Sequence, residues 1–244
     1  MKPEKSEGLD VIDAPAIINI RDVTDMIGSV LLLDKPSGCT SYDCIRRLKR
    51  YFPKSTKIGH AGTLDPLATG LLILLFGKAT KSQQRFMNLT KRYEATMRLG
   101  ETTSSMDSET EVIEHKAISG ITPDQIQAAI EKKIGVIDQI PPMYSAIKVK
   151  GERLYKKARR GEVIQRKPNR VTLYSIELLD INGADVRFSV KCSKGTYIRV
   201  LAHDLGQSLG VGGHLIQLRR TAIGNYHVQR ASTLDTLTNF FERS

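Results

Sequence analysis

A turn-rich segment followed by an unbroken apolar run constrains this chain more than any other feature. The segment, residues 59–70, contains three glycines, one proline and one carboxylate, Asp65. The run that follows, residues 71–76, is entirely apolar and flanked by glycines, which is typical of a buried strand. Glycine and proline allow backbone shapes that other residues avoid. The sequence therefore predicts a carboxylate on a shaped loop anchored to a rigid strand, where functional residues often lie.

The residues of this segment leave more than one interpretation open. An aspartate before a proline is commonly a turn former whose side chain binds a nearby backbone N–H. The spacing Gly59-x-x-Gly62 also occurs in nucleic-acid clamps of the KH type, although two glycines carry little information. A phosphate-binding P-loop is excluded, because no Gly-Lys-Ser/Thr follows at the required spacing.

The chain carries a large excess of positive charge. It has 37 basic and 26 acidic residues and a formal net charge of +11, which favours a polyanionic partner. Two acidic residues, Glu152 and Glu162, oppose ten basic residues between positions 148 and 170. The basic residues are Lys148, Lys150, Arg153, Lys156, Lys157, Arg159, Arg160, Arg166, Lys167 and Arg170. A solvated helix face is the alternative interpretation of this basic stretch. The nearby Tyr144 and Tyr155 favour RNA binding, because basic residues follow the phosphate backbone and aromatic rings stack on bases.

Several classes of protein are disfavoured by composition. Cys39, Cys44 and Cys192 form no CxxC pair, which suits a reducing cytosol and argues against a disulfide framework or a thiolate metal site. The histidines lack metal-ligand spacing. No apolar stretch approaches the roughly 18 residues of a membrane span, and residues 1–8 lack the apolar part of a secretory signal. We expect a cytoplasmic protein without metal, cofactor or membrane contact.

Periodicity predicts an α+β fold with a mixed, mainly antiparallel central sheet flanked by helices and loops. Strands are expected at residues 30–33, 71–76, 93–99, 171–178 and 186–192. Residues 102–111 are expected to form a polar loop.

Four helices are expected, and their ends are marked by capping residues. They cover residues 42–52, 123–133, 198–209 and, as a short helix, 235–241. Ser41 is the expected cap of the first, with Tyr42, Ile45, Leu48 and Phe52 on one face. Thr122 is the expected cap of the second, and Gly135 its end.

Five segments, in order along the chain, resemble motifs of the TruB-type tRNA pseudouridine synthases. Residues 59–70 resemble the family segment G-H-x-G-x-L-D-P-x-A-x-G, whose aspartate is catalytic. The others are Leu-Leu-Asp-Lys-Pro-Ser-Gly-Cys-Thr-Ser at 32–41, Lys-Arg-Tyr-Glu-Ala at 91–95, Pro-Pro-Met-Tyr-Ser-Ala-Ile-Lys at 141–148 and Cys-Ser-Lys-Gly-Thr-Tyr-Ile-Arg at 192–199. The resemblance covers roughly residues 29–228 and implies the pseudouridine-synthase fold.

The resemblance implies an isomerase that flips out the T-loop uridine of tRNA (uridine 55) and converts it to pseudouridine. Asp65 matches the catalytic residue that cleaves the glycosidic bond before rejoining at C5. Attack at C6 of the base, attack at C1′ of the sugar and elimination at the sugar all stay open. Arg199 matches the arginine that pairs with the aspartate, and Tyr93 matches the tyrosine that stacks on the target base.

The same resemblance assigns the remaining site residues. Tyr197 and Leu218 match positions in the pocket wall, and His60 matches the histidine that fills the space left by the flipped base. Lys35 is expected to support the active-site loop or a phosphate. The family also has an RNA-binding thumb, here about residues 141–168. Its predicted RNA-binding residues are Lys148, Lys150, Arg153, Lys156, Lys157, Arg159 and Arg160.

The predicted domains are an N-terminal extension (1–28), a catalytic domain (29–228) and a short C-terminal tail (229–244). Many bacterial relatives continue into a PUA-type RNA-binding domain, for which this tail is too short. The expected partner is the T-arm stem-loop of tRNA, with no protein partner required. Two alternatives are a non-catalytic tRNA-binding or tRNA-folding protein on the same scaffold, and a synthase acting at sites selected by guide RNA.

Overall fold

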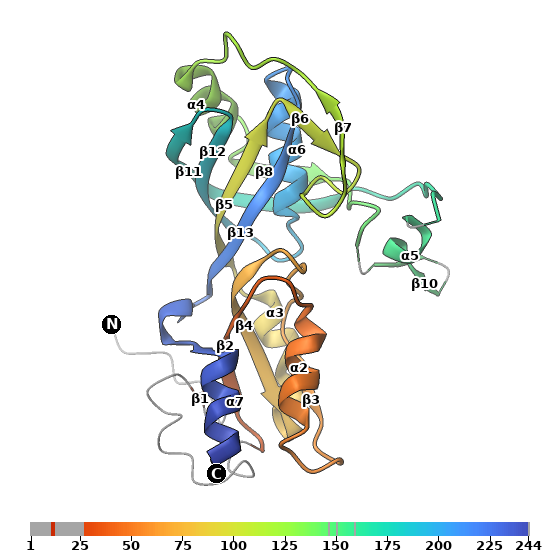
Figure 1. Ribbon diagram of the computed structural model, residues 1–244, viewed down its shortest axis with the longest axis vertical. Helices are drawn as coiled ribbons and strands as arrows, with labels where there is room; N and C mark the ends of the chain where they lie inside the picture. Colours follow the sequence, from red (N-terminus) through yellow and green to blue (C-terminus); the bar gives the residue numbers. More distant parts are fainter. Residues whose placement is uncertain (1–10, 13–26, 146, 150, 159, 244) are drawn as a thin grey trace. The chain divides into compact units, whose positions relative to one another are not determined.

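A computed structural model describes residues 11–12, 27–145, 147–149, 151–158 and 160–243 (Figure 1). Its internal contacts divide the chain into two compact units. The first unit comprises Met1–Arg92 and Arg219–Ser244, and the second comprises Tyr93–Leu218. Most of the predicted N-terminal extension, residues 1–10 and 13–26, lies outside the described residues.

The first unit is built on two buried antiparallel strands, β2 (Val30–Lys35) and β4 (Thr69–Phe76). Their register places Val30 opposite Leu75 and Lys35 opposite Gly70. Five further strands among the described residues extend this sheet. They are β3 (Ile58–His60), antiparallel to β4; β1 (Val11–Ile12) and β15 (Ser232–Thr233), parallel to β2; β13 (Gly213–Ile223), parallel to β4; and β14 (Tyr226–His227), antiparallel to β13.

The apolar run of β4 is unbroken because both faces of the strand are covered. Alternate residues of β4 enter two separate hydrophobic clusters. One cluster contains α2 (Ser41–Lys49) and α7 (Leu234–Arg243), which pack side by side (Figure 1). The other contains residues of η2 (Gly77–Ser82) and α3 (Gln83–Asn88). The buried strands predicted at 30–33 and 71–76 are confirmed.

The predicted cap of α2 is wrong by one residue. Thr40 is the cap: its Oγ1 accepts from Asp43 N at 3.1 Å, while Asp43 Oδ2 accepts from Thr40 N at 3.0 Å. This reciprocal pair is a capping box. Ser41 is instead buried in the first turn, where its Oγ accepts from Leu64 N at 2.9 Å and donates to Leu64 O at 3.2 Å. A serine that looked like a cap therefore anchors the loop that carries Asp65.

The predicted apolar face of α2 is only partly right. Ile45 and Leu48 are buried, but Tyr42 is 67% exposed, and Cys44 takes the expected place in the buried stripe. The helix ends at Lys49, so Phe52 reaches the core from the turn that follows.

The second unit contains the long strand β11 (Asn169–Asn182), which pairs antiparallel with β12 (Asp185–Cys192) and β8 (Gly135–Gln139). β5 (Lys91–Leu99) neighbours β12, and β13 neighbours β5. Every second residue of β5 from Tyr93 to Leu99 is buried. The strands predicted at 93–99, 171–178 and 186–192 are confirmed, whereas β8 and β13 were not predicted.

Two helices of the second unit pack against each other, α4 (Pro123–Glu131) and α6 (Ile198–Ser208). Thr122 caps α4 as predicted, since its Oγ1 accepts from Gln125 N at 3.3 Å. The predicted end of α4 is wrong, because the helix stops at Glu131 and Gly135 begins β8. Gly135 has a φ of 117°, which suits the sharp change of direction into the strand.

The predicted polar loop at 102–111 is more ordered than expected. It begins within β6 (Glu101–Thr103), which pairs antiparallel with β7 (Val112–His115). Thr103, Ser105 and Asp107 are almost completely buried. Polar composition suggested solvent exposure, but these buried side chains are hydrogen-bonded: Thr103 and Ser105 donate to the carbonyl of Asp107, and the carboxylate of Asp107 accepts from Glu109 N.

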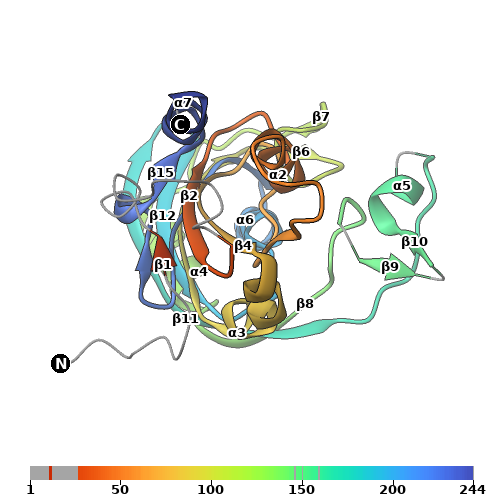
Figure 2. The ribbon, with the colours of Figure 1, turned by 90° about the horizontal axis from the view of Figure 1, so that it is seen from below.

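The predicted thumb segment forms a small lobe that extends from β8 and β11 (Figure 2). It contains the hairpin β9 (Lys148–Val149) and β10 (Glu152–Arg153), followed by α5 (Leu154–Ala158). Leu154, at the start of α5, is fully buried.

The predicted α+β class is confirmed, because parallel and antiparallel pairs occur together with several helices. The short helix predicted at 235–241 is α7. Among the described residues, none of the helices combines the length and apolar character needed to cross a bilayer.

Candidate active site

The predicted site residues divide between the two units. Lys35, His60 and Asp65 belong to the first. The second contains Tyr93, Tyr197, Arg199 and Leu218, together with the thumb.

Asp65 is half-buried in the loop between β3 and β4. Its carbonyl accepts from Ala68 N at 3.1 Å, which closes a turn through Pro66. Gly62 and Gly70 flank this loop with φ values of 97° and 99°, a region that other residues rarely adopt. Two of the three glycines of the segment, Gly62 and Gly70, are therefore required by its backbone shape, as the sequence predicted.

A second segment, residues 36–41, holds the Asp65 loop through several hydrogen bonds. Gly38 N donates to Pro66 O at 2.9 Å, and Ser37 Oγ donates to Leu67 O at 3.1 Å. Ser41 binds both main-chain groups of Leu64, the residue before Asp65. These contacts on both sides of Asp65 limit the movement of its backbone.

Lys35 is completely buried against the same loop. Its Nζ donates to Ala68 O at 2.7 Å, Pro36 O at 2.8 Å and Pro66 O at 3.4 Å. Burial lowers the pKa of Lys35, whereas the nearby carboxylate of Asp65 opposes this change. The contacts favour support of the loop over phosphate binding, the two roles expected for Lys35.

His60, at the end of β3, lies close to the Asp65 loop in sequence and is largely buried. Its carbonyl accepts from Gln83 Nε2 at 2.7 Å, whereas its buried Nδ1 has no hydrogen-bond partner among the described residues. Burial lowers the pKa of His60, and the charge of Arg220 lowers it further. The ring is therefore neutral near pH 7, which suits stacking on an apolar surface.

In the second unit, the predicted pocket residues lie on separate elements. Tyr93 is in β5 with 8% of its surface exposed, and Leu218 is in β13 with 9% exposed. Tyr197 precedes α6, where its N–H donates to Gln139 Oε1 at 2.9 Å and its carbonyl accepts from Gln139 Nε2 at 3.2 Å. The amide of Gln139 thus fixes the start of the helix that carries Arg199.

Arg199, in the first turn of α6, forms a buried ion pair with Asp107. Its Nη1 lies 3.1 Å from Asp107 Oδ2, and the two side chains are 4% and 0% exposed. Asp107 was missed in the sequence because it lies in a segment interpreted as a polar loop. No local pattern distinguishes it there, since its partner is 92 residues away in the chain.

The basic residues predicted to bind RNA have different environments in the thumb. Lys150 and Arg159 lie outside the described residues, as do the side chains of Lys148 and Arg153. Lys156 is exposed.

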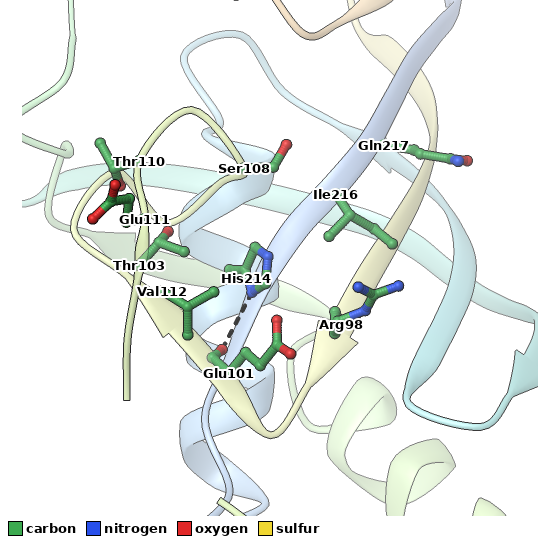
Figure 3. Close-up of a pocket in the computed structure, with 10 residues that line it drawn as sticks. All are labelled: Arg98, Glu101, Thr103, Ser108, Thr110, Glu111, Val112, His214, Ile216 and Gln217. Carbon is green, nitrogen blue, oxygen red and sulfur yellow. Dashed lines mark hydrogen bonds between the residues drawn. The ribbon is translucent and has the colours of Figure 1, made fainter. Parts of the chain in front are cut away.

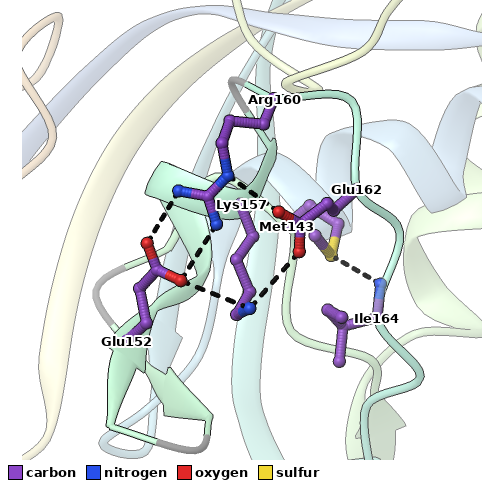
Figure 4. Close-up of polar contacts among 6 residues, drawn as sticks. All are labelled: Met143, Glu152, Lys157, Arg160, Glu162 and Ile164. Carbon is purple, nitrogen blue, oxygen red and sulfur yellow. Dashed lines mark hydrogen bonds and ion pairs between the residues drawn. The ribbon is translucent and has the colours of Figure 1, made fainter.

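Lys157 and Arg160 enter an ion-pair network with both acidic residues of the thumb (Figure 4). Arg160 binds Glu152 through two nitrogens, at 2.7 and 2.9 Å, and Glu162 through Nε at 2.7 Å. Lys157 Nζ lies 3.3 Å from each carboxylate. The hydrogen bonds from Arg160 hold the pKa of Glu152 down at about 2. Two of the predicted RNA-binding cations are therefore already paired in the free protein.

The second unit also contains an open depression of about 410 Å³ (Figure 3). Its wall includes Arg98, His214 and Gln217, and His214 Nδ1 lies 3.3 Å from Glu101 O. The residues that line it in the described part of the chain include none of the predicted site residues. Within the same part of the chain, no group of three or more His, Cys, Asp and Glu side chains could hold a metal ion.

Sequence comparison shows close relatives over most of the chain. The profile of the TruB family pseudouridylate synthases, N-terminal domain, matches residues 49–198. The profile of the tRNA pseudouridylate synthase B C-terminal domain matches residues 199–244. The chain is 50% identical to tRNA pseudouridine synthase B of Ralstonia pickettii over 86% of its length and 67% of that protein. It is 45% identical to the protein of the same name from Burkholderia lata over 98% of its length and 74% of that protein.

Solved structures give the same assignment of fold. A chain from a Cbf5–Nop10–Gar1 complex superposes with a TM-score of 0.66 and 32% identity, covering 86% of this chain and 53% of its own. A chain from an H/ACA RNP bound to a substrate RNA containing 2′-deoxyuridine superposes with a TM-score of 0.63 and 31% identity. The match covers 86% of this chain and 52% of that one. The present chain therefore spans about half the length of these solved chains. By its matched profiles and its identity to these relatives, the chain belongs to the TruB family of pseudouridylate synthases.

Proposed function

We propose that this protein converts the T-loop uridine of tRNA, uridine 55, to pseudouridine. The observation that carries the proposal is the carboxylate of Asp65 on a loop held from both sides, inside a segment that matches the family motif. Relatives at 45–50% identity are named tRNA pseudouridine synthase B, which supports tRNA pseudouridine synthase activity.

The reaction breaks the N1–C1′ bond, rotates the uracil, joins C5 to C1′ and releases the proton of C5. It is an isomerisation without a redox step, so we propose that it needs no cofactor. A carboxylate serves such sugar chemistry as a nucleophile or as the partner of a positively charged intermediate. In this proposal Asp65 acts at C6, acts at C1′ or assists elimination at the sugar.

The other residues bind and orient the uridine. Tyr93 stacks on the base and takes part in removing the C5 proton, and Arg199 pairs with Asp65. Tyr197 and Leu218 form the wall of the pocket. Lys35 holds the loop of Asp65 through main-chain carbonyls.

The uridine must leave its stacked position to reach the carboxylate, which costs a few kcal/mol. His60 fills the vacated space, and aromatic stacking worth about 1–3 kcal/mol per base offsets much of that cost. The neutral state of His60 favours this role, because a charged ring would be costly to desolvate.

The proposed partner is the T-arm stem-loop of tRNA, bound through the basic thumb in the cytoplasm without a protein partner. Lys156 is the exposed cation of α5 that is free to reach a phosphate, whereas Lys157 and Arg160 must leave their carboxylates to do so. Basic residues in such a lobe follow the phosphate backbone and make binding salt-dependent.

Tritium release from a T-arm stem-loop labelled at C5 of uridine tests the proposal. We expect release by the wild type and none by Asp65→Asn, with RNA binding retained by both. C5 loses its hydrogen when it becomes the glycosidic carbon, so release reports the reaction itself. No release by the wild type on either the stem-loop or full tRNA would leave the non-catalytic tRNA-binding alternative. Release only after adding guide RNA and partner proteins would favour the guide-directed alternative.

A further inference from the structure

Arg220, in β13, is the largest fully buried side chain among the described residues, with 1% of its surface exposed. Its Nε donates to Leu71 O at 2.7 Å, and its Nη2 donates to Gly62 O at 3.0 Å. In the sequence these two carbonyls lie on either side of Asp65: Gly62 precedes it and Leu71 follows it. A single guanidinium therefore ties together the two ends of the segment that carries the carboxylate.

The backbone of Arg220 holds the same segment at another point. Gly70 and Arg220 are paired in parallel register, and a Cβ at Gly70 would lie 2.4 Å from Arg220 O. Only glycine allows the two chains to come this close. The main chain and the side chain of Arg220 thus contact three residues of the segment: Gly62, Gly70 and Leu71.

The chemistry of this contact explains why the residue is an arginine. Carbonyls that are withdrawn from water need donors, and a guanidinium offers several N–H groups in a rigid planar fork. A lysine carries its donors at one point and a glutamine has a single amide, so neither spans both carbonyls equally. A buried charge costs free energy that an apolar side chain does not. A requirement for packing alone would therefore be met better by an apolar residue.

Electrostatics connect Arg220 with the rest of the site in the first unit. Burial lowers the pKa of Lys35. The carboxylate of Asp65 raises this pKa, whereas the charge of Arg220 lowers it. The charge of Arg220 also lowers the pKa of His60, after burial. Lys35 and Arg220 thus surround the Asp65 loop with two buried positive charges, which favour the ionised form of a nearby carboxylate.

We propose that Arg220 is a positioning residue for Asp65, fixing the geometry of its loop and supplying positive charge near its carboxylate. Arg220 acts through Asp65 and does not touch the uridine. This inference rests on the proposed function, because it assigns Arg220 a part in that reaction.

Two substitutions and a matched control separate this role from packing. Arg220→Lys keeps the charge and removes the planar fork, and Arg220→Gln removes the charge. Arg219→Gln is the control, since Arg219 is the preceding residue of β13 and binds the carboxylate of Asp34 at 2.7 and 3.1 Å. Circular dichroism checks folding, and tritium release from the labelled stem-loop is measured as a function of pH.

Arg220→Lys is expected to lower kcat by about 100-fold with KM unchanged, because small displacements of a catalytic group have effects of this size. Arg220→Gln is expected also to move the acid limb of the kcat profile to higher pH, because it removes a positive charge near the carboxylate. A purely structural role would not shift this limb. If Arg220→Gln does not fold, the loss of kcat at constant KM in Arg220→Lys decides the question.

The positioning role would be overturned if Arg220→Lys had the same kcat as the control Arg219→Gln. A folded Arg220→Gln whose acid limb matches the wild type would also overturn it. Both results are read against an active wild type, so they leave the proposed function intact. Absence of release by the wild type is a different result and overturns the proposed function itself.

Discussion

Arg199 donates from Nη1 to Oδ2 of Asp107 at 3.1 Å, and both side chains are buried. Asp107 is held firmly, because Thr103 Oγ1 and Ser105 Oγ donate to its carbonyl at 2.7 and 3.1 Å. An arginine with such a fixed partner presents its remaining donors at a defined position. In the proposed reaction, Asp107 therefore determines where Arg199 acts.

Asp107→Ala is expected to lower the free energy of unfolding by about 3–5 kcal/mol, because it leaves the buried charge of Arg199 uncompensated. Tritium release should fall as well. Asp185→Ala is the matched control, because the Arg98–Asp185 pair is 41% and 31% exposed and such pairs contribute about 1 kcal/mol or less. Urea denaturation measures the free energy of unfolding of both variants. Equal losses in the two variants would contradict a special contribution of the buried pair.

Ser41→Ala is expected to cost about 1–3 kcal/mol, because it leaves the buried N–H of Leu64 without its acceptor. It should also slow tritium release, since Leu64 precedes Asp65. Thr40→Ala removes the helix cap next to it and is expected to cost about 1 kcal/mol with release unchanged. If both variants slow release equally, Ser41 has no specific effect on the loop.

Gly70→Ala is expected to cost about 3 kcal/mol or more, because the new methyl group meets the backbone of Arg220 in addition to the strain at φ 99°. Gly210→Ala separates the two effects, since its φ is 80° but the site is open. We expect a cost of about 1–2 kcal/mol there, from the backbone conformation alone. Chemical denaturation compares the two, and similar costs would show that the close approach is unimportant.

Glu152→Gln combined with Glu162→Gln is expected to strengthen T-arm binding and to make it more salt-dependent. The change removes two negative charges and frees Lys157 and Arg160 for phosphates, which increases counterion release. Fluorescence anisotropy at several salt concentrations measures both effects. Asp124→Asn combined with Glu131→Gln, both on α4, controls for the same change of net charge. Weaker binding by the double variant would instead show that the network is needed to fold the thumb.

The stability of the protein is expected to fall as the pH drops below about 6.5, the usual pKa of histidine, partly through His60. Burial first, and the charge of Arg220 second, lower the pKa of His60 in the folded state. The unfolded chain then binds more protons than the folded chain in this range, so acid favours unfolding. His60→Gln should reduce the acid sensitivity of the unfolding free energy. The exposed His227 provides the control: His227→Gln should retain the wild-type dependence.

Features that depend on neighbouring residues could be predicted from the sequence. The apolar run of β4, the alternation of β5 and the Thr122 cap of α4 are local patterns, and each is confirmed. The shaped loop around Asp65 was also predictable, because glycine and proline determine backbone conformation wherever they occur. The cap of α2 and the ends of α2 and α4 were predicted wrongly. Thr40 and Ser41 are equally good caps by residue type, so the local sequence does not choose between them.

The surroundings of the candidate site depended on contacts between distant parts of the chain. Arg199 and Asp107 are 92 residues apart, and Arg220 and Gly62 are 158 residues apart. No periodicity links such pairs, because burial and hydrogen bonding are decided only when the strands and helices pack. The sequence by itself thus determined the α+β class, the basic thumb and the Asp65 loop through local conformational preferences. Only the tertiary structure decided that Lys35 supports the loop rather than a phosphate and that Arg220 also holds it, because their partners are main-chain carbonyls that carry no signal in the sequence.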